Sequence, residues 1–166
     1  LSGSDTAPSD AFGFSAAMSG TTAAVGTLGH DHGGIGGTGA VYVLQYDRGM
    51  WRETQELLPP VPEAGDGFGS ALAIDGDVLV ASANGHDTFG MHNAGIAHVF
   101  ERRPHGWIHT AALVPADLAA DDTFGTDVAV SGTTIVVGKS RDNGYRGAAY
   151  VFEKTPAGWV ETAKLA

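Results

Sequence analysis

The sequence predicts an all-β protein made of three four-stranded antiparallel units, and three observations support this prediction. The motif Asp-x-Phe-Gly occurs at residues 10–13, 66–69 and 122–125, so that its phenylalanines are 56 residues apart. A tryptophan closes each unit, at Trp51, Trp107 and Trp159. Glycine accounts for 25 of the 166 residues. This is about twice the usual share of roughly 7%, and it is typical of many turns between short strands.

Four short strands follow one another in each unit. The first comes directly after Phe-Gly, as at 69–74, where the side chains alternate. The second follows a tight turn that contains a glycine, as at 78–81. The third is the apolar run after a later glycine, as at 149–153, and the fourth contains the tryptophan, as at 51–57. We expect the motif phenylalanines and the tryptophans to pack between neighbouring units.

A four-stranded antiparallel unit repeated at this spacing indicates β-propeller blades. A β-sandwich of about twelve strands is the alternative, but a sandwich does not require three equivalent units. The expected repeats are 1–56, 57–112 and 113–166, and the last of them has lost four residues between Gly138 and Gly147.

The third unit most closely resembles the FG-GAP repeat, with Phe124-Gly125 followed by apolar runs at 135–138 and 147–152. FG-GAP repeats build propellers of the integrin α-subunit type and many bacterial extracellular proteins, so the resemblance implies a secreted or cell-surface protein of the bacterial type. Members that bind calcium have an acidic loop between the first two strands of a blade. Here that connection is a short turn, as at 75–77, and cannot supply the roughly six to eight oxygen ligands of calcium.

Three blades cannot close a propeller ring, which typically needs about four to eight. Leu1 aligns with Leu57 and Leu113, so the sequence starts and stops at nearly the same phase of the repeat. We therefore expect head-to-tail pairing with copies of the same chain, with a six-bladed homodimer favoured. A fragment of a longer natural propeller and an engineered chain are the alternatives.

The composition excludes several functions. With 9 Lys and Arg against 19 Asp and Glu, the net charge is −10, which disfavours nucleic acid and anionic membranes as partners. The absence of cysteine excludes a disulfide scaffold, a thiolate zinc site and a cysteine nucleophile. The longest apolar runs are too short for a membrane-spanning helix.

The loops between the second and third strands differ most between the units, and we expect ligands to bind there. The candidate ligand-binding residues are His30, Asp31, His86, Asp87, Phe89, Asp142, Asn143 and Tyr145. Their polar groups can bind a ligand such as a sugar, on whose ring the two aromatic side chains can stack. Alternatively, the aspartates cap their own turns.

The sequence contains no recognisable catalytic motif, neither a nucleophile elbow nor a zinc-protease or phosphate-binding motif. His30-Asp31-His32 would suit a transition metal only if its rings converged, and no third ligand has a defined spacing, so we expect neither metal nor cofactor. We expect a non-enzymatic module that binds extracellular carbohydrate or protein. A purely structural propeller segment is the alternative, and a hydrolase with its site at the central entrance is a third hypothesis.

Overall fold

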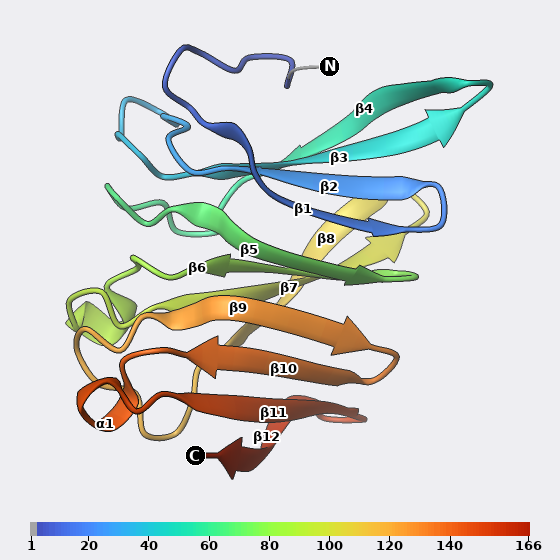
Figure 1. The fold of residues 1–166 in the computed structure, drawn as a ribbon. Helices are drawn as coiled ribbons and strands as arrows, with labels where there is room; N and C mark the ends of the chain where they lie inside the picture. The colour runs from blue at the N-terminus through green and yellow to red at the C-terminus, as the bar shows by residue number, and fades with distance from the viewer. Residues whose placement is uncertain (1–2) are drawn as a thin grey trace.

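The computed structural model describes residues 3–166, except for the side chains of residues 143 and 144. Leu1 and the side chain of Asn143 therefore lie outside the described residues. The described strands form three four-stranded antiparallel sheets, which we call blades 1, 2 and 3 (Figure 1). Their strand orders are β1-β2-β3-β4, β5-β6-β7-β8 and β12-β11-β10-β9. The all-β prediction and the prediction of three four-stranded units are confirmed.

Each blade has the same succession of strand lengths. Blade 1 contains β1 Phe12–Ser19, β2 Thr22–Thr27, β3 Ala40–Asp47 and β4 Met50–Leu57. Blade 2 contains β5 Phe68–Asp75, β6 Val78–Ala83, β7 Ile96–Arg103 and β8 Gly106–Leu113. Blade 3 contains β9 Phe124–Ser131, β10 Thr134–Lys139, β11 Ala148–Thr155 and β12 Gly158–Leu165. Two helical turns, η1 Thr88–Gly90 and α1 Asp142–Tyr145, lie in loops, and neither is long enough to cross a membrane.

The Phe-Gly pairs of blades 2 and 3 join each of these blades to the one before it. The pairing register of β5 with β6 shifts directly after Phe68, where Gly69 has a φ of +86°. Only glycine adopts such a φ without strain. As a result Phe68 leaves the regular ladder and forms a parallel bridge with Gly39 of blade 1. Phe124 forms the same bridge with Gly95, so the motif is a connection between blades.

The aspartate of the motif has a structural role in every blade. It accepts a hydrogen bond from a backbone N–H three residues earlier, in the segment that leads into the first strand. The pairs are Asp10 with Ala7 at 2.8 Å, Asp66 with Glu63 at 2.7 Å and Asp122 with Ala119 at 2.6 Å. The carboxylate thereby fixes the turn before Phe-Gly.

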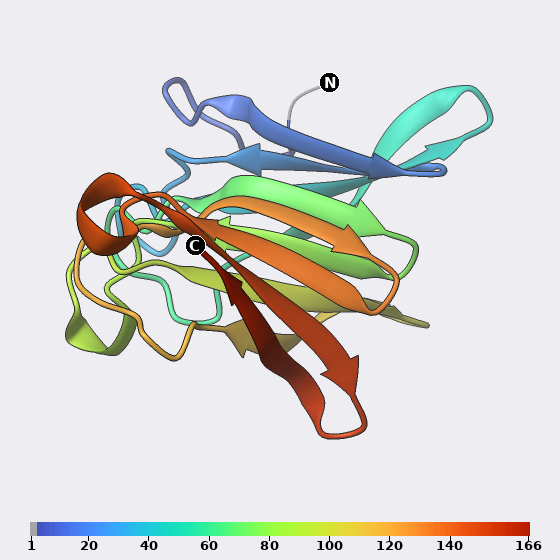
Figure 2. The same ribbon diagram turned by 60° about the horizontal axis from the view of Figure 1, so that its bottom comes forward.

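The apolar core lies between adjacent blades, where β5 packs on β1 and β2, and β9 packs on β5 and β6 (Figure 2). Phe68 and Phe124 are fully buried there, and Trp107 is nearly so. The expectation that these aromatic residues form an interblade core therefore holds at both junctions. Phe12 is only half-buried, because its side of blade 1 carries no preceding blade within the described chain.

Candidate functional site: the loop end of the blades

The loops between the second and third strands gather at one end of the blades, together with the segments that connect one blade to the next. They occupy the left side of Figure 1, and the short hairpins occupy the right. The sequence predicts ligand binding at these loops, and all the predicted residues whose side chains are described lie at this end.

Three of the predicted residues occupy one repeated position, at intervals of 56 residues, and each faces its own blade. His30 is 5% exposed, with Nδ1 3.6 Å from Asp10. His86 is half-buried, and its Nδ1 lies 3.0 Å from Asp66 Oδ1 in a hydrogen bond that raises the pKa of the imidazole. Asp142 is 4% exposed. These side chains line the corners of the blades and are not displayed to solvent.

Asp31 and Asp87 bind the backbone of their own loops. Asp31 Oδ1 accepts the N–H of Gly37 at 2.8 Å, and Asp87 Oδ1 accepts the N–H of Asn93 at 2.8 Å. This is the turn-capping alternative considered for these aspartates. That these aspartates bind a ligand stays a prediction. Only the second carboxylate oxygen of each, Oδ2, would be available for it.

Phe89 and Tyr145 present their rings to solvent. Phe89 is 84% exposed and Tyr145 is 77% exposed, and both residues have a positive φ that turns the side chain outward from a short helical turn. The Arg141 guanidinium lies 5.8 Å from the Tyr145 ring centre. Among the predicted residues with described side chains, these two offer the most accessible surface.

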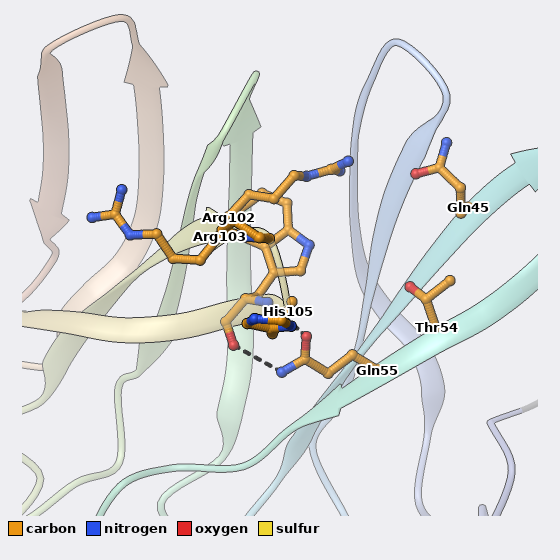
Figure 3. Close-up of a pocket in the computed structure, with 9 residues that line it drawn as sticks. Gln45, Thr54, Gln55, Arg102, Arg103 and His105 are labelled. Atoms are coloured by element: carbon orange, nitrogen blue, oxygen red, sulfur yellow. Dashed lines mark hydrogen bonds between the residues drawn. The ribbon is translucent and has the colours of Figure 1, made fainter.

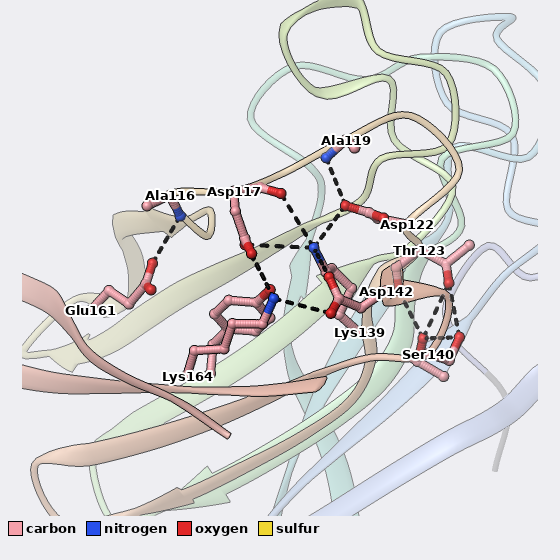
Figure 4. Close-up of polar contacts among 12 residues, drawn as sticks. Ala116, Asp117, Ala119, Asp122, Thr123, Lys139, Ser140, Asp142, Glu161 and Lys164 are labelled. Carbon is pink, nitrogen blue, oxygen red and sulfur yellow. Dashed lines mark hydrogen bonds and ion pairs between the residues drawn. The ribbon is translucent and has the colours of Figure 1, made fainter. Parts of the chain in front are cut away.

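The corner of blade 3 holds a charged network that the sequence does not reveal (Figure 4). Lys139 is 1% exposed, and its Nζ lies 2.9 Å from Asp122 and 2.8 Å from Asp142. Burial by itself would lower the pKa of Lys139, but the hydrogen bonds to Asp142 and Asp122 outweigh it and raise the pKa. A charged lysine is therefore stable in this nearly closed position.

A second lysine completes the network. Lys164 Nζ lies 2.6 Å from Asp117 Oδ2 and 3.0 Å from Asp142 Oδ2. Asp117 also accepts a hydrogen bond from the Tyr150 hydroxyl at 2.6 Å. Burial tends to raise the pKa of Asp117, but the bonds from Lys164 and Tyr150 outweigh it and hold the pKa at about 2. The only hint in the sequence is a lysine, Lys139, at the end of an apolar strand.

The equivalent corners of the other two blades contain histidine and acid groups. Asp5, His30 and Glu56 in blade 1, and Glu63, Asp66 and His86 in blade 2, each bring three potential metal-ligand atoms within 4.8 Å of one another. The sequence predicts no metal here, because no third ligand of defined spacing accompanies His30-Asp31-His32.

A separate cleft of about 570 Å³ lies between blades 1 and 2, near their outer hairpins (Figure 3). Gln55 closes one side of it, since its Nε2 donates to the Trp107 carbonyl at 2.8 Å and its Oε1 accepts the Trp107 N–H at 2.7 Å. Arg103 is paired with Glu101 at 2.6 Å. None of the predicted ligand residues lines this cleft, and its polar groups largely serve the junction between the blades.

Comparison with known proteins is consistent with this architecture. The family model described as "FG-GAP repeat" matches residues 1–44, 51–100 and 107–152. A search among curated proteins gives no match. The three matched segments cover most of the chain and recur once per repeat, in agreement with the Phe-Gly connections between the blades. The chain belongs to the FG-GAP repeat family.

Proposed function

We propose that this chain is a non-enzymatic propeller module that closes a six-bladed ring with a second copy of itself and presents its loop end to an extracellular ligand. One observation carries the proposal. The outer faces of blades 1 and 3 hold the two halves of a contact that the chain already makes twice, between blades 1 and 2 and between blades 2 and 3.

The junction of blades 1 and 2 is fixed at both ends by hydrogen bonds. At the loop end the Phe68 N–H donates to the Thr38 carbonyl at 2.9 Å. At the hairpin end the Gly76 N–H donates to Ser19 Oγ at 3.1 Å. Between these points the two blades share an apolar core.

The junction of blades 2 and 3 repeats this pattern at equivalent positions. The Phe124 N–H donates to the Ala94 carbonyl at 2.8 Å, and the Gly132 N–H donates to Asp75 Oδ2 at 2.7 Å. The chain thus has one way of joining successive blades, and it uses the same backbone groups each time.

Blade 1 carries the free half that a preceding blade would cover. Met18 is 65% exposed, whereas Ile74, the equivalent residue at the first junction, is 9% exposed. Phe14, on the same strand, is 58% exposed. Exposed apolar side chains at a position that is buried elsewhere in the same molecule indicate a surface for association.

Blade 3 carries the opposite half. Val136 is half-exposed, whereas its equivalent Val80 is fully buried at the second junction. An open groove of about 170 Å³ runs past Val136, Gly138 and Ala149. A blade 1 face seated here would pair Phe12 with Gly147, as Phe68 pairs with Gly39. Two copies would then supply six blades, within the usual range of about four to eight.

Light scattering on a size-exclusion column tests the association. We expect a particle of twice the 17.0 kDa chain mass. Gly138→Leu should block it, because a Cβ at the equivalent Gly26 would lie 2.2 Å from the Gly69 carbonyl oxygen across the first junction. Within its own chain a Cβ at Gly138 meets atoms no closer than 3.6 Å, so the blade itself can accommodate the substitution.

Met18→Asp is the second disrupting variant, and Met50→Asp is its matched control, since Met50 is 53% exposed but lies at a hairpin. A monomer for the unmodified chain at every concentration would contradict the homodimer. That result would favour further FG-GAP blades, instead of a second copy of this chain, as the partners of the two outer faces.

For the ligand we propose a carbohydrate. Phe89 and Tyr145 offer exposed rings beside polar groups at the loop end, and an aromatic face provides a large contact area at little cost in side-chain entropy. A glycan array should give a signal that falls at least about tenfold in the Phe89→Ala/Tyr145→Ala double variant, because both stacking surfaces are removed. Tyr46→Ala is the control, as Tyr46 is exposed near the other end of blade 1.

A blank array from a protein that still forms the dimer would contradict the carbohydrate proposal and favour the purely structural role. Retention of glycan binding by the double variant would place the ligand elsewhere on the molecule.

A further inference from the structure

We propose that the corner of blade 1 formed by Asp5, His30 and Glu56 binds a divalent transition-metal ion such as Zn²⁺. The site lies at the loop end, away from the turn between the first two strands of the blade. It rests on unpartnered buried groups and on a comparison among the three blades.

The three residues come from separate parts of blade 1. Asp5 precedes β1, His30 lies in the loop after β2, and Glu56 is near the end of β4. Their potential ligand atoms all lie within 4.8 Å of one another, and His30 Nε2 is 3.4 Å from Glu56 Oε1. A tetrahedral zinc ion with ligand distances of about 2.1 Å needs ligand atoms roughly 3.5 Å apart, so the set requires a contraction of at most about 1.3 Å.

Buried polar atoms without hydrogen bonds surround this corner. His30 Nδ1 and Glu56 Oε1 are shielded from solvent and have no hydrogen-bond partner among the described residues, although the His30 ring is only 6% exposed. Thr27 Oγ1, in a residue that is fully buried, is in the same condition. Such groups carry an energetic penalty unless a further partner satisfies them.

Blade 3 shows what such a corner contains when two lysines offset its carboxylates. Thr27 occupies the register position of Lys139, as each is the last residue of its strand and pairs with an alanine of the next. Glu56 occupies the position of Lys164. Blade 1 therefore lacks both ammonium groups, although its corner has three carboxylates, Asp5, Asp10 and Glu56, as that of blade 3 does. No Lys or Arg pairs with Asp5 or Glu56 within residues 3–166.

Blade 2 balances its corner in another way. Its His86 is hydrogen-bonded directly to Asp66 at 3.0 Å, so the imidazole already has a partner on the nitrogen that faces the acid. In blade 1 the equivalent His30–Asp10 separation is 3.6 Å, and Nδ1 forms no hydrogen bond. The two histidines are equivalent in position, but only His86 has a hydrogen-bond partner on Nδ1.

The arrangement in blade 1 matches the way proteins hold metal-binding histidines. One ring nitrogen, Nε2, faces Glu56, and the other, Nδ1, faces Asp10, a carboxylate that can orient the ring from behind. Asp5 is itself positioned by the Tyr42 hydroxyl, which donates to its Oδ1 at 2.6 Å. One imidazole and two carboxylates favour a borderline ion such as Zn²⁺ over Ca²⁺, which prefers oxygen ligands alone.

Calorimetric titration of the chelator-treated chain with ZnCl₂ tests the inference. We expect saturable binding of one ion per chain and a higher unfolding temperature with zinc, because the ion binds the folded state. His30→Gln should weaken the binding at least about tenfold. His86→Gln is the matched control, at the equivalent position of blade 2, and should bind zinc as the unmodified chain does.

Thr27→Lys distinguishes a metal-binding role of His30 from a merely structural one, because it leaves His30 in place. The new ammonium group would reach the corner as Lys139 does in blade 3. We expect this variant to lose the zinc-dependent rise in unfolding temperature while remaining folded without zinc. If it does not fold, His30→Gln and His86→Gln decide the question by themselves.

Three results would overturn the inference. The first is the absence of saturable zinc binding, and the second is zinc binding that survives His30→Gln or disappears in His86→Gln. The third is saturation of the site by CaCl₂ at lower concentrations than by ZnCl₂, because this result would exclude a transition-metal site.

Discussion

Blades 1 and 3 use the same backbone for corners that differ in charge. In each, a tyrosine hydroxyl donates to an aspartate that precedes the first strand, Tyr42 to Asp5 and Tyr150 to Asp117, both at 2.6 Å. Blade 3 then places two lysines among three aspartates, whereas blade 1 has a histidine and no lysine among three carboxylates. The comparison teaches that the repeat determines the strands and the Phe-Gly connections and leaves the charge of the corner free to diverge.

The strongest way to break this comparison is to remove the buried cation of blade 3. Lys139→Met removes the ammonium group that Asp122 contacts and leaves Lys164 as the lysine partner of Asp142, and we expect the free energy of unfolding to fall by about 3–5 kcal/mol. Urea denaturation at pH 7 measures the loss. Lys154→Met is the control, because that lysine is 39% exposed and its loss should lower the free energy of unfolding much less. Equal effects of the two variants would show that the network contributes no more than a surface ion pair.

Blade 2 sharpens the comparison through pH, because its corner contains a histidine where the other blades have tyrosine. Burial, with a contribution from His109, lowers the pKa of His98 to about 3. Between that value and the unfolded value of roughly 6.5, the unfolded chain binds the additional proton, so stability is present above about pH 6.5 and decreases on acidification. From pH 6.5 to pH 5 we expect a loss of about 1–2 kcal/mol from this group.

His98→Phe should flatten that part of the pH profile, since a phenyl ring can pack on Phe68, whose ring centre lies 5.7 Å from that of His98. Urea denaturation at several pH values provides the profile. His105→Gln, at an exposed hairpin position, controls for the removal of a histidine as such. An unchanged slope in His98→Phe would mean that other groups determine the acid sensitivity.

The smallest expected effect is that of the outer lysine of blade 3. Lys164→Met removes the ion pairs with Asp117 and Asp142, but the side chain is 28% exposed and water can replace part of each contact. We expect only a fraction of the loss seen in Lys139→Met, measured in the same urea series. A loss as large as that of Lys139→Met would mean that the two lysines act as one unit.

The fold was predictable from the sequence because its motifs record backbone requirements. Gly69 and Gly125 must adopt a positive φ next to the preceding blade, so the Phe-Gly pair recurs at a fixed interval. The corners were not predictable to the same degree. Asp117 and Lys139 meet across 22 residues and a blade connection, and no local pattern announces that contact. For Asp31 the sequence allowed both ligand binding and turn capping, and only the folded loop brings the Gly37 N–H to the carboxylate.

The Phe-Gly bridges also bear on how the chain reaches its native state. Gly39 and Phe68, like Gly95 and Phe124, are only 29 residues apart in sequence. Loop closure costs more entropy the longer the loop, so these bridges should form before contacts between more distant parts of the chain. We therefore expect successive sheets to dock in order as synthesis proceeds. Closure between two copies would be the sole bimolecular step, so that folding yield should depend on protein concentration only at this last stage.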